Sequence, residues 1–150
     1  MQSNLFNRLK GFLRWMWQQE GTPGYRARGL AIGVFCGCFP LFGLQTLIGL
    51  ALASLLRCNH LLAAAGTLIS NPITYLPLYW LNYQVGSVLL GQNWNDQYLG
   101  DLSWWTILDQ GRYFVHCIFL GSFIVGLVLG GGIGILSYLV LNQATHKTNI

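Results

Sequence analysis

Polar side chains that could bind a ligand lie close to two prolines, Pro40 and Pro72, inside long uncharged stretches. The candidate substrate-binding residues follow or flank these prolines: Gln45, Asn71, Thr74 and Tyr79. A proline inside a helix removes a hydrogen bond and clashes with the preceding turn, so a helix breaks there. Two helices that restart after such breaks would present free N–H groups and positive dipole ends, which bind anions.

This pattern predicts a polar intramembrane site for an anionic or polar headgroup, as transporters build at broken helices. Further polar residues lie near the same two breaks: Thr46, Thr67, Ser70, Tyr75 and Asn82. The alternative is that Asn71 caps its own helix and that the other polar groups bond neighbouring carbonyls.

Cysteine and histidine stand close together at three places, which raises the question of a metal site. The pairs are Cys36-x-Cys38, Cys58-x-His60 and His116-Cys117. Their spacings differ from those of zinc ribbons and fingers, and buried thiols usually behave as small hydrophobes. The sequence also lacks GxSxG, HExxH and Walker motifs and paired carboxylates. We expect no metal, no cofactor and no enzymatic activity.

The composition indicates a protein embedded in a membrane. Charged residues make up 8% of the 150 residues and apolar residues 53%, whereas soluble domains are about 25% charged. Residues 29–56, 58–95 and 113–146 contain no Asp, Glu, Lys or Arg. Each stretch exceeds the roughly 18 apolar residues that mark a membrane-spanning helix. A soluble globule, a disordered chain and a disulfide-rich scaffold are excluded by the same numbers.

Two of the uncharged stretches are too long for one straight helix and contain a proline. Residues 29–56 would form a helix of about 42 Å, against a hydrocarbon core of about 30 Å. In residues 61–91, Asn71 is a good N-cap and Pro72 a good first helical residue, so a helix should restart at Pro72. We predict a broken segment in each, discontinuous or re-entrant. A single kinked span is the alternative for the first.

The rest of the chain is predicted from its aromatic and apolar content. Residues 92–112 are polar, acidic and rich in Trp, which is typical of a loop at headgroup level. Residues 113–141 read as one full transmembrane helix.

Residues 4–19 are predicted to form an amphipathic helix in the membrane interface. Its apolar positions recur at helical spacing: Leu5, Leu9, Phe12, Leu13 and Met16. The opposite side is polar and basic: Asn7, Lys10, Arg14 and Gln18. Such a helix binds anionic lipid headgroups, and its aromatic residues fit lipid better than nucleic acid. The alternative is a helix packed on the protein's own cytoplasmic surface.

The distribution of Lys and Arg predicts the orientation. If residues 29–56 form a re-entrant hairpin and the next two segments each cross once, seven Lys/Arg share one side and Arg112 lies opposite. If all three segments cross, the split is six against two. Both arrangements place the N-terminus in the cytoplasm, in a bacterial inner or internal membrane. We expect the N-terminus to be retained, because the following apolar run is far longer than that of a signal peptide.

Glycines recur every four residues in two places. The two runs are Gly29, Gly33 and Gly37, and Gly126, Gly130 and Gly134. Small residues at this spacing let helix backbones approach closely in lipid. The pattern fits packing within the chain, which we expect, and also fits a homo-oligomer or a larger membrane complex.

The residues around both prolines resemble a bacterial membrane family, domain of unknown function 2062. The resemblance covers roughly residues 26–91 and rests on these runs: Arg28-Gly29-Leu-Ala-Ile-Gly33, Pro40-Leu-Phe-Gly43-Leu-Gln45, Arg57-Cys-Asn59, Gly66-Thr67, and Ser70-Asn71-Pro72-Ile-Thr74-Tyr-Leu-Pro77-Leu-Tyr79 with Tyr83 and Gly86. The N-terminal helix, the Trp-rich loop and the last helix lie outside the strongest similarity. Some relatives are fused to glycosyltransferase-like domains, which implies envelope lipid or glycan work. The resemblance implies a membrane protein in which both breaks matter, and it names no substrate.

The sequence therefore predicts one all-α integral membrane domain over residues 1–150. It consists of an interfacial helix, two proline-broken helical segments and one full transmembrane helix. The first functional hypothesis is transport or lipid handling at the polar site between the breaks. The second is a structural or assembly partner of a larger membrane complex, packing through the glycine runs.

Overall fold

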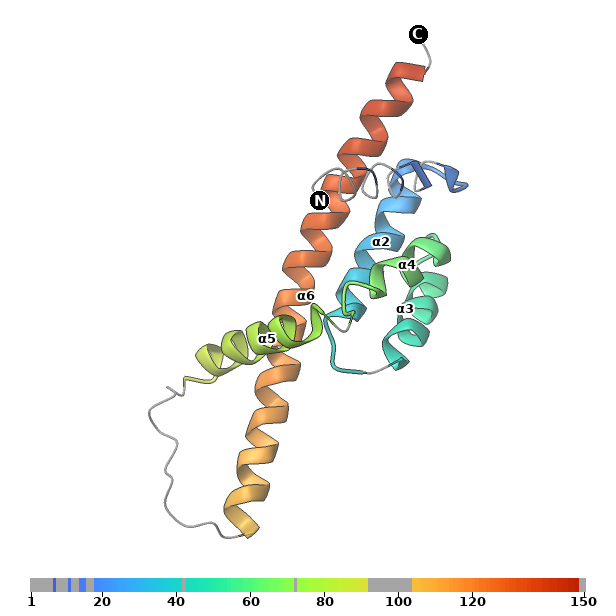
Figure 1. Ribbon diagram of the computed structural model, residues 1–150. Helices are drawn as coiled ribbons and strands as arrows, with labels where there is room; N and C mark the ends of the chain where they lie inside the picture. Colours follow the sequence, from blue (N-terminus) through green and yellow to red (C-terminus); the bar gives the residue numbers. More distant parts are fainter. Residues whose placement is uncertain are drawn as a thin grey trace.

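The structure, a computed structural model, describes residues 7, 11, 14–15, 18–41, 43–71, 73–91 and 104–148, with the backbone alone at 104–110 and 144–148. These residues contain helices and no β-strand (Figure 1). The helices are α2 (Pro23–Gly37), α3 (Leu44–Leu55), α4 (His60–Thr67), α5 (Tyr75–Leu89) and α6 (Trp104–Thr148). The prediction of an all-helical chain is confirmed.

The central helix is α2, which contacts α6, α4 and α3. It begins at Pro23, where the missing N–H of proline costs no hydrogen bond, and the Thr22 hydroxyl accepts from the Tyr25 N–H at 3.3 Å. In Figure 1, α2 lies along α6, and the α3–α4 hairpin lies on the far side of α2 from α6.

The first glycine run lets α4 approach the backbone of α2. A Cβ at Gly33 would overlap the carbonyl oxygen of Ala63, and a Cβ at Gly66 would lie 2.8 Å from the Cα of Gly33. Gly29 and Gly37 face the same neighbour at its two ends, with Gly29 against the Asn59 backbone. Only glycine allows this approach.

The second glycine run lies on α6 and faces the opposite side of α2. A Cβ at Gly130 would lie 2.8 Å from the carbonyl oxygen of Ala31, and a Cβ at Gly126 would lie 3.0 Å from Cδ2 of Phe35. Gly134 faces the Cβ of Ala31. The first run, on α2, therefore faces α4, and the second run, on α6, faces α2. The two runs do not face each other.

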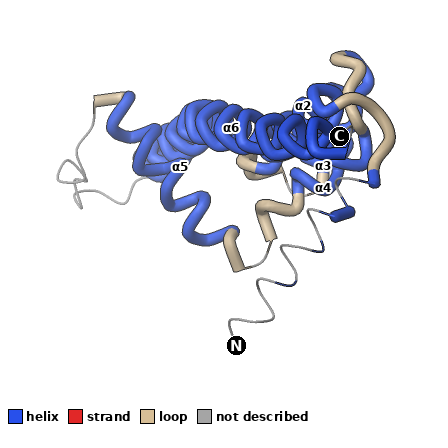
Figure 2. Tube along the Cα trace, turned by 90° about the horizontal axis from the view of Figure 1, so that it is seen from above, coloured by secondary structure: helices blue, strands red, loops and turns tan. Residues whose placement is uncertain are grey.

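A third close contact joins α5 to α6, and it uses glycines outside the two runs. A Cβ at Gly86 would overlap the carbonyl oxygen of Cys117, and a Cβ at Gly121 would overlap that of Asn82. In Figures 1 and 2, α5 crosses α6 at this level instead of running along it. Leu78 and Val125 pack together beside this crossing.

Helix α6 has 45 residues and would be about 68 Å long. Its stretch Gly111–Gln143 is, within the described residues, the one helix long and apolar enough to cross a membrane. Only 28% of its most apolar window is buried in the chain. A core helix of a soluble protein would be mostly buried, whereas most of this window lies on the surface of the described chain.

Helix α6 begins earlier than the sequence predicted. Residues 104–112, expected in the Trp-rich loop, are helical, while residues 92–103 lie outside the described residues. Trp104–Gln110 contains neither Gly nor Pro. Extending an existing helix costs far less than nucleating a new one, and this explains the earlier start.

The predicted interfacial helix at 4–19 falls mostly outside the described residues. Of the described positions, Asn7, Arg14 and Gln18 are exposed, as expected for its polar side. Trp15 packs against a cluster of buried leucines that includes Leu30. This contact agrees with the alternative in which the segment packs on the protein itself.

Candidate functional site

The first break lies between α2 and α3. Helix α2 ends at Gly37 and α3 begins at Leu44, with Pro40 in the connection. Gly43 turns the chain with a φ of 81°, a left-handed conformation that L side chains rarely adopt. Because the helix stops here, the carbonyl groups at the end of α2 need hydrogen-bond donors from elsewhere in the chain.

Two side chains of α5 donate hydrogen bonds to the carbonyls at the first break. Asn82 Nδ2 lies 2.8 Å from the Cys38 carbonyl oxygen, and the Tyr79 hydroxyl lies 3.3 Å from that of Phe39. Asn82 Nδ2 also donates to Ser122 Oγ on α6, at 2.9 Å. Asn82 is wholly buried, so this one amide ties the end of α2 to α5 and α6. Carbonyl groups left free at a buried helix end need donors of this kind.

A second set of polar contacts joins α3 to the segment around α4. Gln45 Nε2 donates to Ser70 Oγ at 2.8 Å, and the hydroxyls of Thr46 and Thr67 lie 3.1 Å apart. The other amide atom of Gln45, Oε1, is buried and has no hydrogen-bond partner among the described residues. An unpaired buried carbonyl oxygen is costly, and it marks a place where a ligand or water donor would be stabilised.

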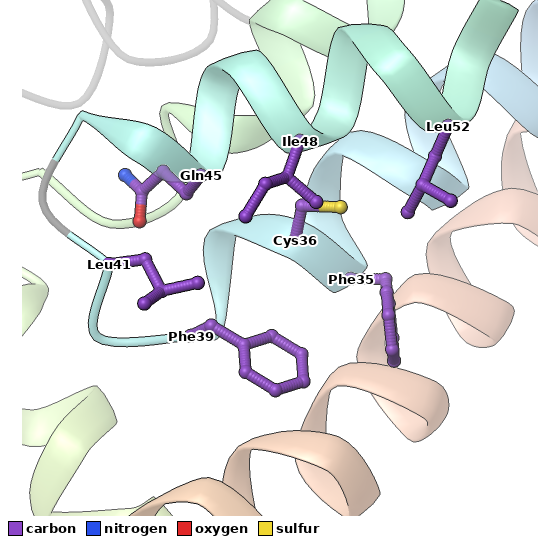
Figure 3. A pocket seen from close by; sticks show the side chains of 7 residues that line it. All are labelled: Phe35, Cys36, Phe39, Leu41, Gln45, Ile48 and Leu52. Carbon is purple, nitrogen blue, oxygen red and sulfur yellow. The ribbon is translucent and has the colours of Figure 1, made fainter.

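Gln45 stands at the edge of a cavity between α2 and α3 of about 140 Å³. The other lining side chains are apolar: Phe35, Cys36, Phe39, Leu41, Ile48 and Leu52. Figure 3 shows Ile48 and Leu52 extending from α3 towards Cys36 on α2, with Phe39 and Leu41 coming from the connection between the helices. The cavity is therefore an apolar space, and the amide nitrogen of Gln45 is bonded to Ser70.

The second break lies between α4, which ends at Thr67, and α5, which begins at Tyr75. Asn71 Oδ1 accepts from the N–H groups of Ile73 and Thr74, at 2.9 and 3.0 Å, and Thr74 Oγ1 accepts from the Asn71 N–H at 3.0 Å. These bonds form a closed local turn, and Asn71 is exposed. This is the alternative in which Asn71 caps its own chain segment.

The predicted helix start at Pro72 lies outside the described residues. The regular part of α5 begins at Tyr75. The Tyr75 N–H donates to the Asn71 carbonyl oxygen at 2.9 Å, so the bonds around Asn71 are those of the N-cap that the sequence predicted. The N–H groups of Ile73 and Thr74 are thereby occupied by a protein side chain.

Of the four predicted site residues, Gln45 alone lines the cavity between α2 and α3. Asn71, Thr74 and Tyr79 are not among its lining residues. Asn71 and Thr74 form hydrogen bonds with each other. The Tyr79 hydroxyl donates to the Phe39 carbonyl oxygen at the first break, and its ring packs against that of Tyr75, with ring centroids 4.4 Å apart.

Two residues at the centre of the molecule, Asn82 and Ser122, were not among the predicted site residues. The available signal was the presence of an amide in an otherwise apolar stretch, since polar groups inside a membrane are costly and usually have a specific partner. Ser122 lies four residues before Gly126, the first glycine of the second run. Their partnership spans 40 residues, and no local pattern reveals such a distance.

The cysteines are packing groups in this structure. All four are buried and free of disulfide bonds. Burial raises the pKa of the Cys58 thiol, while the charge of Arg28 acts in the opposite direction. Among the described residues, no three His, Cys, Asp or Glu side chains lie close enough to hold a metal ion.

A family model described as "Uncharacterized protein conserved in bacteria (DUF2062)" matches residues 7–149. The chain belongs to the DUF2062 family. The match includes the N-terminal residues and α6, so DUF2062 extends well beyond the 26–91 region that carries the sequence resemblance. Searches of curated proteins and of solved structures find no match.

Proposed function

We propose that this DUF2062 protein is an integral membrane protein that handles lipid. Helix α6 supports the membrane assignment, because apolar side chains cover its exposed surface, among them Phe119, Leu127, Val128 and Leu136. Water does not tolerate a continuous apolar surface of this length on a monomer, whereas a bilayer matches it.

The α2–α3 pair is proposed as a re-entrant hairpin. Helices α2, α3 and α4 have 15, 12 and 8 residues, which gives lengths of about 22, 18 and 12 Å against a core of about 30 Å. The Asn59 N–H, just after α3, donates to the Tyr25 carbonyl at the start of α2, at 3.3 Å. The chain thus returns to the end from which it entered.

The same end of the molecule carries the basic residues, which supports a cytoplasmic assignment for it. Arg26 lies in the first turn of α2, and Arg57 precedes Asn59. Gly24 lies beside Tyr138 of α6, so the C-terminal part of α6 with Lys147 extends from this end too. Arg112 stands at the opposite part of α6. By the positive-inside rule, both termini are cytoplasmic.

The observation that carries the lipid proposal is the wholly apolar cavity at the first break. Apolar walls suit a hydrocarbon chain of a lipid. The geometry favours lipid over an ion or a small polar solute, because the remaining polar side chains at the breaks bond one another or the backbone.

The role of assembly partner receives less support from the contacts. The glycines on which that hypothesis rested, such as Gly33 and Gly130, face other parts of the same chain. A partner would have to use another surface.

Filling the cavity tests the lipid proposal. Ile48→Trp should lower the amount of lipid that co-purifies with the protein in mild detergent, measured by mass spectrometry of extracted lipid. Leu47→Trp is the matched control, because Leu47 is the preceding residue of α3, is 64% exposed and does not line the cavity. A thermal melt of each variant establishes that it is folded. Equal lipid content in the two folded variants would reject the proposal.

A further inference from the structure

A groove of about 390 Å³ runs between α2 and α6, and it shares no lining residue with the cavity between α2 and α3. Small residues form much of its wall, including Ala31 and Gly131, and Arg28 and Tyr138 also line it. The groove is open to the surroundings of the protein, and it lies beside the basic end described above.

The polarity of the groove changes along its length. Arg28 is exposed, its Nε donates to the Gly24 carbonyl oxygen at 3.2 Å, and Tyr138 lines the same groove. Gly131 lies seven residues before Tyr138 on α6, about 10 Å deeper, where Ala31 and Ile135 make the lining apolar. A phospholipid has the same order, with a charged phosphate followed by hydrocarbon.

We propose that this groove binds one anionic phospholipid from the cytoplasmic leaflet, with its phosphate at Arg28 and an acyl chain along Gly131. Guanidinium matches phosphate with two parallel charge-assisted hydrogen bonds, and the Tyr138 hydroxyl can donate a further one. The same end of the molecule also contains Arg26, Arg57 and Lys147, so its positive electrostatic potential attracts anionic headgroups. The positive charge at this end favours an anionic lipid as the occupant of the groove over a neutral lipid. It also favours an anionic lipid over an uncharged helix of another protein chain.

The two neighbouring glycines Gly131 and Gly132 give a matched pair of variants. A Cβ at either position meets nothing within 4 Å, so a larger side chain fits the fold at both. Gly131 lines the groove and Gly132 does not. Arg28 and Arg57 form a second pair, because each removal lowers the charge of the same end by one, and only Arg28 lines the groove.

The test is native mass spectrometry of the full chain in detergent, titrated with phosphatidylglycerol and, separately, phosphatidylcholine. The wild type should bind one phosphatidylglycerol, and Gly131→Leu and Arg28→Gln should each weaken it by about tenfold. Gly132→Leu, Arg57→Gln and the cavity variant Ile48→Trp should bind it as the wild type does. The last comparison separates this site from the one in the proposed function.

Three outcomes would overturn the inference. Equal binding of phosphatidylcholine would remove the role of the phosphate charge. Equal losses in Gly132→Leu and Arg57→Gln would indicate a general effect of bulk or net charge. A change in the dimer fraction of Gly131→Leu, with phosphatidylglycerol binding intact, would assign the groove to a second copy of the chain.

Discussion

The two helix breaks of this protein satisfy their backbone in opposite ways. At the first, between α2 and α3, the Cys38 carbonyl receives its hydrogen bond from Asn82, 44 residues away. At the second, between α4 and α5, Asn71 and Thr74 satisfy each other within four residues. The first break therefore depends on the whole fold, whereas the second can form as soon as its own residues are made.

The largest effect should come from separating α5 from α6, which removes the donors of the first break. In Gly121→Val the new side chain would overlap the Asn82 carbonyl, and we expect a loss of unfolding free energy of more than about 4 kcal/mol. The buried thiols of Cys38 and Cys117 should then react rapidly with maleimide. Gly111→Val is the control, because a Cβ at Gly111 meets nothing within 4 Å. Thiols as protected as in the wild type would contradict the dependence on this crossing.

Removing the central amide should have the next largest effect. Asn82→Leu leaves the buried Cys38 carbonyl without its donor, which should cost about 2–3 kcal/mol of unfolding free energy. The quantity is measured by denaturant titration in detergent. In a double-mutant cycle with Ser122→Ala, the two losses should be less than additive, since both changes break the same bond. Additive losses would show that Asn82 and Ser122 act independently.

At the second break the effect should be smaller and local. Asn71→Ala removes the acceptor for the Ile73 and Thr74 N–H groups and should cost about 1 kcal/mol, as for other capping residues. Hydrogen exchange should accelerate at those two amides, while Cys38 stays protected. Asn71→Ser should restore most of the protection. Exposure of Cys38 in Asn71→Ala would mean that the two breaks are coupled.

The smallest effect is expected for Tyr79→Phe. The lost bond to the Phe39 carbonyl is long, at 3.3 Å, and the ring contact with Tyr75 remains, so about 0.5 kcal/mol should be lost in a denaturant titration. Tyr138→Phe, which lies away from both breaks, serves as the control. A loss as large as that of Asn82→Leu would move the centre of the first break from Asn82 to Tyr79.

The difference between the breaks also explains what the sequence could predict. The turn at Asn71 involves neighbouring residues, and its capping chemistry was one of the two interpretations open from the sequence. The partner of the Cys38 carbonyl was not predictable, because hydrogen bonding across 44 residues leaves no periodic trace. Glycine spacing likewise identified smooth helix faces at Gly33 and Gly130 without identifying their neighbours.

The all-helical class was predictable because apolar stretches without charge leave the backbone few other ways to satisfy itself. The start of α6 was not, since the Trp-rich stretch has the composition of an interfacial loop and is helical from Trp104. The cavity at Gln45 was foreseen only as a polar site. Its apolar character arises because Phe35 of α2 and Ile48 of α3 line the same cavity. That contact depends on how α2 and α3 pack together, which the sequence does not reveal.

The position of α2 between α4 and α6 has a consequence for biosynthesis. Chains are synthesised from the N-terminus, so α4 can dock on Gly33 and its neighbours while α6 is still unmade. Until α6 has been made, the Ala31 and Phe35 side of α2 lacks the helix that covers it. The nascent protein can therefore assemble in order, with α2, α3 and α4 packing first and α6 packing last.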